Sequence, residues 1–150
     1  MNRIIPILTA GIFACGCHSA RGAKAPLSPE KLKKQSSHIV TGTVLEVSST
    51  TRKSEVETGI GIHVDRIYTI RLKVKTLSKG TGIEADDEIE IVAWRPERRI
   101  PLQPGLQGHE SIPKKGDSVT VYVKGKKGKA YEPILPNGIK IEKAKEKEKE

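Results

Sequence analysis

The chain has 150 residues and carries 27 Lys and Arg against 18 Asp and Glu, a formal net charge of +9; 35% of its residues are hydrophobic and 3% are aromatic. This length predicts one domain rather than two, and the apolar fraction is sufficient for one modest core. No apolar run approaches the roughly 20 residues that cross a bilayer as a helix, which excludes a polytopic membrane protein. The absence of cysteine beyond residue 17 excludes a disulfide-dense scaffold.

The first residues have the pattern of an export signal. Arg3 supplies a short positive region, and the apolar stretch of residues 4–13 has the length of a signal-peptide hydrophobic region. Both cysteines, Cys15 and Cys17, follow it directly. This arrangement resembles the processing site of a bacterial lipoprotein, which implies a lipid anchor on one cysteine. Ordinary cleavage, which would leave a free soluble protein, is the alternative.

Cys15 is the preferred lipidation site, because Ile12 lies three positions before it and Ala14 immediately before it. The bulky Phe13 departs from the usual lipoprotein pattern at its position. A diacyl anchor supplies two chains, enough for stable membrane attachment. We therefore expect residues 1–14 to be a signal peptide and the protein to be anchored in the cell envelope or, without an anchor, to be periplasmic or extracellular.

A small, polar and basic segment follows the cysteines. Residues 15–35 are expected to form a flexible tether that ends in a short helix. Ser28 is a typical N-cap, and Pro29 suits the first helical position, so the helix should run to about Gln35. A helix of this length needs packing against another element to be stable.

Period-two alternation of β-branched residues begins after the helix and predicts strands. Gly42 indicates a bend or bulge in the first strand. The expected strands cover residues 39–47, 68–74, 88–94, 119–123 and 131–135, with 139–141 closing the chain. Between them we expect a polar link at 48–61, a long Pro- and Gly-containing loop at 95–117, a lysine-rich turn at 124–129 and a turn at 136–138. Residues 143–150 should be a charged, disordered tail.

Five main strands within residues 36–142 favour an all-β domain, a small five-stranded Greek-key barrel with one short N-terminal helix. The segments IVTGTV, YTIRLKV, LSKG and KKGDSVTVYV, in this order, resemble an OB-fold of the netrin-module or tissue-inhibitor-of-metalloproteinases type. The resemblance implies the barrel but not the inhibitory mechanism, in which an N-terminal cysteine reaches a zinc ion. Here that cysteine would be acylated and has no disulfide partner. A β-sandwich is the alternative fold.

Two pairs of residues could ligate a metal. His63 and Asp65 are two positions apart, so both point to one face of a strand, and His109-Glu110 could supply a second pair. Ordinary polar surface is the alternative for all four. No nucleophile elbow and no phosphate-binding loop is present, so we expect no enzymatic activity and no cofactor.

The segment from Trp94 to Glu110 is a candidate interaction surface, because Trp and Arg are enriched at the energetic centres of interfaces. Its candidate residues are Trp94, Arg95, Arg98, Arg99, His109 and Glu110. The alternative is that Trp94 caps the barrel core and the prolines stiffen a passive connection.

Two groups of basic residues are a second candidate surface. They are Arg71, Lys73 and Lys75 on one strand and Lys124, Lys126 and Lys127 in the turn after another. They would favour an anionic lipid, an acidic polysaccharide or an acidic envelope protein. Alternatively, they only protect strand edges and maintain solubility. A nucleic acid is not expected, since the domain has few aromatic stacking platforms.

These observations together predict an exported, lipid-anchored binding or interaction module of the cell envelope, without catalytic activity. The first alternative is a metal-binding protein or metal-dependent enzyme that uses His63, Asp65, His109 and Glu110. A purely structural envelope component is the second.

Overall fold

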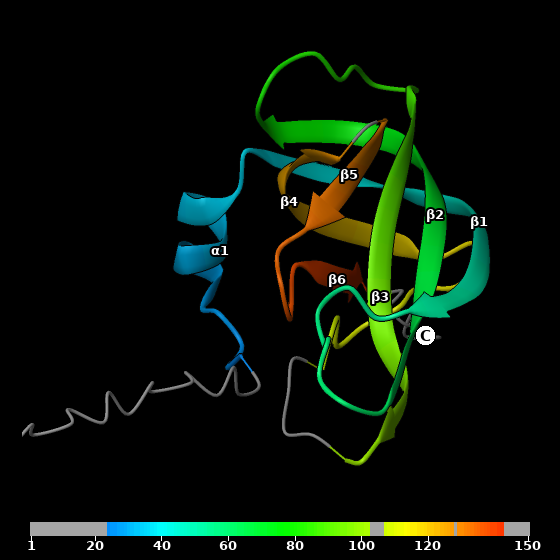
Figure 1. The fold of residues 1–150 in the computed structure, drawn as a ribbon. Helices are drawn as coiled ribbons and strands as arrows, with labels where there is room; N and C mark the ends of the chain where they lie inside the picture. The colour runs from blue at the N-terminus through cyan, green and yellow to red at the C-terminus, as the bar shows by residue number, and fades with distance from the viewer. Residues whose placement is uncertain (1–23, 103–106, 128, 143–150) are drawn as a thin grey trace, which may run out of the picture.

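The computed structural model describes residues 24–102, 107–127 and 129–142 (Figure 1). Its elements are α1 (Pro29–Gln35), β1 (His38–Lys53), β2 (Ile62–Lys79), β3 (Glu88–Ile100), β4 (Ser118–Lys127), β5 (Ala130–Pro133) and β6 (Ile139–Glu142). The predicted all-β class with one short helix is confirmed. All six described strands belong to one sheet, so the alternative β-sandwich is wrong.

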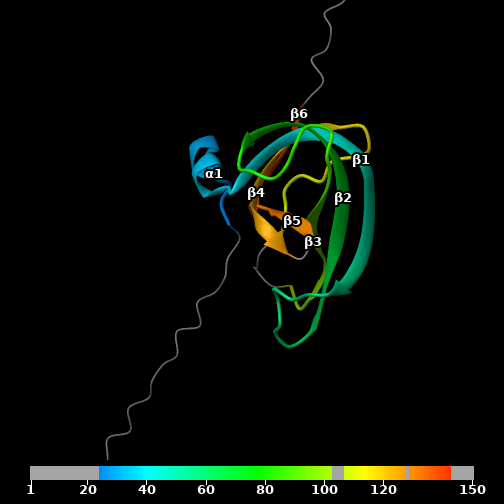
Figure 2. The same cartoon turned by 90° about the horizontal axis from the view of Figure 1, so that it is seen from above.

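The sheet closes into a small barrel because β1 pairs with two strands. The order is β1-β2-β3-β5-β4-β6, and a further antiparallel pairing of β1 with β4 closes the first five of these strands into a ring, while β6 pairs with β4 outside it. β3 and β5 are parallel and meet at Ile91 and Tyr131. Figure 2 shows β1 and β2 curving around the barrel. The register of β1 against β2 shifts at Gly42, as the sequence predicted, and a Cβ there would collide with the Lys73 carbonyl.

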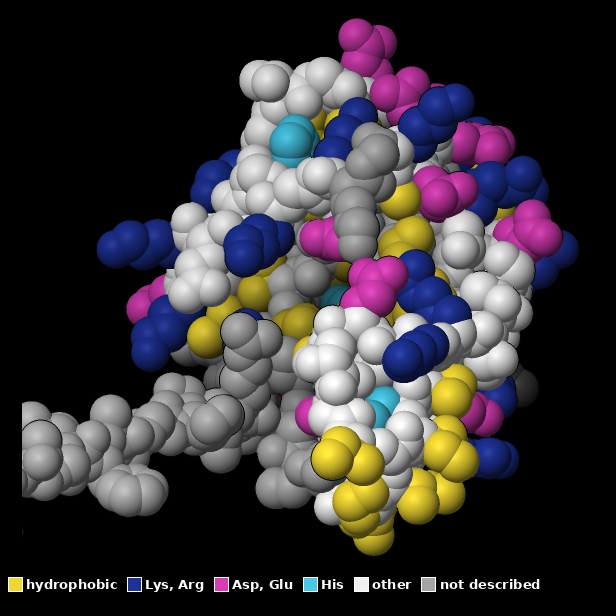
Figure 3. Space-filling model, viewed as in Figure 1, with side chains coloured by type: hydrophobic (Ala, Val, Ile, Leu, Met, Phe, Trp, Pro, Cys, Tyr) yellow, Lys and Arg dark blue, Asp and Glu magenta, His cyan; other side chains and the backbone are white. Residues whose placement is uncertain are grey.

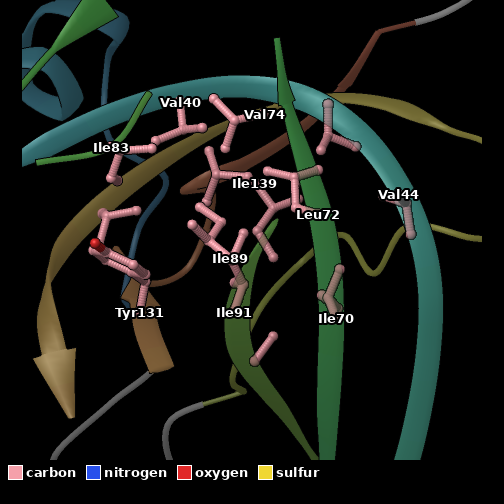
Figure 4. Close-up of a cluster of buried hydrophobic side chains, with 14 residues drawn as sticks. Val40, Val44, Ile70, Leu72, Val74, Ile83, Ile89, Ile91, Tyr131 and Ile139 are labelled. Atoms are coloured by element: carbon pink, nitrogen blue, oxygen red, sulfur yellow. The ribbon is translucent and has the colours of Figure 1, made fainter. Parts of the chain in front are cut away.

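The core fills the barrel with side chains from alternate strand positions (Figure 4). Val40, Leu72, Ile91 and Val121 have at most 1% of their surface exposed. Most of the contributing residues are β-branched, which suits the pleated surface of a sheet. The hydrophobic effect of these side chains is the main stabilising contribution to the barrel.

The predicted helix is confirmed as α1. The Ser28 Oγ accepts a hydrogen bond from the Lys31 amide, and Pro29 occupies the first turn. Seven residues do not make a stable helix alone. α1 is held because Leu32 is fully buried against Ile39, Tyr122 and Ile134, in a second apolar cluster outside the barrel.

Four strands are longer than the sequence predicted. β4 continues to Lys127 and pairs with β5, so the expected lysine-rich turn at 124–129 is wrong over 124–127. The other three are β1, β2 and β3. Residues 48–53 of β1, 62–67 of β2 and 94–100 of β3 continue to pair beyond the barrel, and we call these three segments the arm (Figure 1). The expected polar link at 48–61 and the expected loop at 95–117 are therefore wrong over 48–53 and 95–100. These segments cover no apolar core, so they lack the alternation that marks a half-buried strand.

Candidate binding cleft

A cleft of about 1100 Å³ lies on the outer face of β3. Successive side chains of a strand point to opposite faces, so Ile89, Ile91 and Ala93 enter the core while Glu90, Val92 and Trp94 point outward. The outward residues line the cleft together with Ile67 of β2. Figure 3 shows this face of the molecule, with apolar side chains inside the hollow and charged ones around it.

The opposite wall comes from β5, the segment after it and the chain before α1. Pro133, Ile134, Leu135 and Leu27 line this side. The Leu27 amide donates to the Asn137 Oδ1 at 3.0 Å, and the Asn137 Nδ2 donates to the Leu27 carbonyl at 2.8 Å. These two hydrogen bonds fix the N-terminal segment against the turn that follows β5, so the predicted tether leads into the cleft wall.

Charged residues of both signs surround the apolar floor. Among its described residues the lining contains four basic ones, Lys24, Arg52, Lys124 and Lys129, and four acidic ones, Glu55, Asp65, Glu90 and Glu132. A groove that follows a nucleic-acid backbone is instead predominantly cationic. Arg52 pairs with Glu55, and Asp65 pairs with Arg99. The lining residues that form no ion pair within the described structure, three basic and two acidic, still suit a ligand that itself carries both signs.

His109 lines the cleft and hydrogen-bonds to the backbone of β3 at Trp94. Its amide donates to the Trp94 carbonyl at 2.9 Å, and the Trp94 amide donates to the His109 Nδ1 at 3.1 Å. The His109 Nε2 lies 3.3 Å from the Pro133 carbonyl, so a neutral ring protonated at Nε2 satisfies both contacts. Burial lowers the pKa of His109, against the opposing effect of its backbone hydrogen bonds. His109 thus acts as a neutral connector between β3 and the end of β5.

Part of the predicted interaction surface is assembled here. The Arg95 guanidinium donates to the His109 carbonyl at 2.7 Å and also to the Glu110 carbonyl. Trp94 is half-buried and lies outside both apolar clusters, so it does not cap the barrel core. Arg98 and Arg99 instead lie in the arm.

The four candidate metal ligands do not form one site. His63 and Asp65 are both buried on the same face of β2, as their spacing predicts. His109 contacts Trp94, however, and Trp94 pairs with Ile67, four residues along β2 from His63, or roughly 13 Å at the rise of a strand. Among the described residues no three His, Cys, Asp or Glu side chains gather as a metal site.

The carboxylate of Asp65 is also already occupied. Arg99 forms an ion pair with it in which 10% of the Arg99 side chain and 4% of the Asp65 side chain are exposed. Arg99 also donates to the Val64 carbonyl at 2.8 Å. Neither ring nitrogen of His63 has a hydrogen-bond partner in the described part of the chain. The arm therefore contains a buried polar cluster where the barrel contains an apolar core.

The two groups of basic residues do not form one surface, because β1 lies between β2 and β4 in the sheet. On β2, Arg71 pairs with Glu46 at 3.0 Å, and Lys73 pairs with Asp86 at 3.0 Å. Lys75 is exposed on the same strand.

On β4, Lys124 lines the cleft, while the Lys126 Nζ lies 4.5 Å from the centre of the Tyr131 ring. The side chain of Lys127 lies outside the described part of the structure, as do Cys15 and Cys17.

Sequence reasoning missed several cleft residues, among them Val92 and Ile134. The signal for Val92 was present, since it is an apolar residue on the outward face of an alternating strand. Ile134 and Leu27 could not be found this way, because only the folded chain brings the ends of the domain together.

Comparisons with protein-family models, with curated proteins and with solved structures each gave no match. Within the described residues, no helix has both the length and the apolar character that a membrane crossing requires.

Proposed function

We propose that this protein is an exported, lipid-anchored binding module of the cell envelope, and that its cleft holds an extended polypeptide segment of an envelope partner. The observation that carries this proposal is the cleft itself, with Trp94 and other apolar residues inside and equal numbers of acidic and basic residues among its lining. Its volume of about 1100 Å³ is slightly above the usual range of small-ligand pockets, roughly 300–1,000 Å³, which suits a segment of several residues.

The position of the cleft on the barrel supports binding. In OB-folds, the face of the second and third strands and the adjoining loops commonly bind extended polymers, typically oligonucleotides and oligosaccharides. The cleft uses Asp65 and Ile67 of β2, Trp94 of β3, the β1–β2 connection and the β4–β5 connection. The particular resemblance to netrin modules remains a prediction.

A polypeptide fits the residues that line the cleft better than a nucleic acid or an acidic polysaccharide does. Single-stranded nucleic acid needs a cationic groove with several stacking aromatics, and an acidic polysaccharide needs an excess of basic groups. In the described part of the lining, Trp94 is the only aromatic residue besides His109, and acidic residues are as numerous as basic ones. An extended peptide can place apolar side chains against Trp94 and charged ones against the lining of opposite sign.

Photo-crosslinking in cells tests this proposal. A photoreactive amino acid at Val92, inside the cleft, is compared with one at Lys75, on an exposed face away from it. We expect a discrete adduct from position 92, in which mass spectrometry of the digest finds a second peptide joined to position 92, and none from position 75. Equal adducts from both positions would contradict a cleft-specific partner, and a nuclease- or glycosidase-sensitive adduct would contradict a polypeptide.

A further inference from the structure

The far end of the arm exposes a concentrated apolar surface. Ile60 and Leu102 are 96% and 92% exposed, and Ile62 and Ile100 are 50% and 53% exposed. We call these four residues the tip. They are four of the five exposed large hydrophobic residues in the described structure. Figure 3 shows apolar side chains gathered at this end of the molecule. A grouping of this kind marks a contact surface more often than scattered exposed residues do.

The tip is part of the paired sheet. Ile62 is the cross-strand partner of Ile100, so these two side chains are neighbours on one face. Gly61 has a φ of +134°, and a Cβ at this position would collide with the Ile100 carbonyl. Glycine therefore permits the close approach of the backbones that places Ile62 beside Ile100.

Two basic residues lie directly behind the tip on the same face. Lys53 and Arg98 both pair with Val64, two positions along β2 from Ile62, or about 7 Å. Both side chains are exposed, and neither has an acidic partner in the part of the chain that is described.

The acidic residues of this region are mostly engaged elsewhere. Glu97 pairs with Arg66 at 2.6 Å, Glu55 pairs with Arg52 at 3.3 Å, and Asp65 pairs with Arg99. Glu57 is the remaining carboxylate, and it is half-buried. Lys53 and Arg98 consequently dominate the electrostatics immediately behind the tip.

The predicted anchor can reach this end of the molecule. Lys24 lines the same cleft as Arg52 and Asp65 of the arm. The chain to Lys24 spans at most about 32 Å from Cys15, the preferred lipidation site, and at most about 25 Å from Cys17, when fully extended. A lipidated cysteine would therefore hold the arm close to the bilayer surface.

We infer that the tip inserts into the interfacial region of a bilayer that contains anionic lipids, with Lys53 and Arg98 at the headgroups. Interfacial segments bury their apolar residues about 5–10 Å into the headgroup and acyl boundary, which matches the separation of the tip from its basic residues. This second contact would orient the anchored barrel. It rests on the proposed membrane location, although the insertion itself can be measured without the anchor.

The test uses the full chain carrying Cys15→Ser and Cys17→Ser, with an environment-sensitive fluorophore on a cysteine at Leu102 or, as a control, at Lys75. Vesicles of phosphatidylglycerol and phosphatidylethanolamine are compared with vesicles of phosphatidylcholine alone. We expect a blue shift and quenching by a lipid-embedded quencher for position 102 on the anionic vesicles only, and no change for position 75.

Two further variants examine the parts of the tip. Ile60→Ser with Ile62→Ser should reduce the inserted fraction about tenfold or more, because two aliphatic side chains no longer leave water. Lys53→Ala with Arg98→Ala should remove the preference for anionic vesicles.

No response at position 102, or the same response at positions 102 and 75, would overturn the inference. Insertion without a preference for anionic lipid would overturn the role of Lys53 and Arg98. The intact mass of the protein extracted from its native membrane tests the anchor separately. An acylated protein whose position 102 stays in water would overturn the tip while the anchor stands, and a non-acylated protein whose position 102 inserts would support the tip while the anchor fails.

Discussion

The same three strands are stabilised in opposite ways along their length. In the barrel, β1, β2 and β3 bury apolar residues such as Leu72 and Ile91 and keep charged ones outside. In the arm, they bury His63, Asp65 and Arg99, and the large apolar residues at the tip are exposed. Burial of apolar side chains in the barrel favours folding. Burial of charged side chains in the arm costs free energy unless each charge is specifically paired. The difference indicates that the barrel supplies most of the stability, whereas the arm places charged groups inside and large apolar side chains outside.

The largest expected effect on stability comes from breaking the buried ion pair of the arm, between Asp65 and Arg99. Asp65→Ala leaves Arg99 buried without its counter-ion and should lower the free energy of unfolding by about 3–5 kcal/mol, measured by urea denaturation. The double variant Asp65→Leu/Arg99→Met removes both charges and should remain close to the wild type. A single variant as stable as the wild type would show that the pair is not buried.

Removing apolar volume should destabilise the protein strongly in the barrel and hardly at all at the tip. Leu72 is fully buried, so Leu72→Ala should lower the free energy of unfolding by about 2–5 kcal/mol. Leu102→Ala at the tip is the matched control and should change it by no more than about 0.5 kcal/mol. Similar losses from both substitutions, in the same urea experiment, would remove the contrast between barrel and tip.

The connection between β3 and β5 should depend on pH through His109. Its folded pKa lies below the unfolded value of about 6.5, so protonation opposes folding. This contribution to stability is fully present above that value and is lost as the pH falls through the folded pKa, with a slope of at most about 1.4 kcal/mol per pH unit. Urea denaturation across this range should show the decline in the wild type and a smaller one in His109→Gln. Parallel profiles would contradict the buried, neutral role of His109.

The smallest expected effect concerns the wall of the cleft. Asn137→Ala removes the two hydrogen bonds to Leu27 and should cost about 1 kcal/mol, most of it local. Hydrogen exchange at the Leu27 amide should accelerate severalfold while the amides of β4 are unchanged. Asn137→Asp keeps the acceptor for that amide and should show a smaller acceleration. No acceleration in either variant would contradict the two hydrogen bonds that fix Leu27 against Asn137.

The sequence predicts the barrel better than it predicts the arm. Alternation located the barrel strands, and Ser28-Pro29 located the helix, because both signals depend on burial and capping within a few residues. The arm lacks an apolar core, and Pro96 suggested a loop. Trp94 directs its amide and carbonyl away from β2, towards His109, and Pro96 lies two residues further along the same strand edge. Its missing N–H therefore removes no pairing with β2.

The candidate site was predictable only in part. The sequence correctly placed His63 and Asp65 on one face, and it singled out Trp94, Arg95 and His109. It could not show that Asp65 pairs with Arg99 or that Leu27 reaches Asn137. Both contacts join residues far apart in the chain, and no local pattern encodes them.

The variant Trp94→Ala tests the division between barrel and cleft most directly. Trp94 lies outside both apolar clusters but inside the cleft. We therefore predict that the crosslinked adduct at position 92 falls at least about tenfold, as expected for a tryptophan at the centre of an interface. The loss of stability should be clearly smaller than that of Leu72→Ala. An unchanged adduct, or a loss of stability as large as that of Leu72→Ala, would contradict a role of Trp94 in binding rather than in the barrel core.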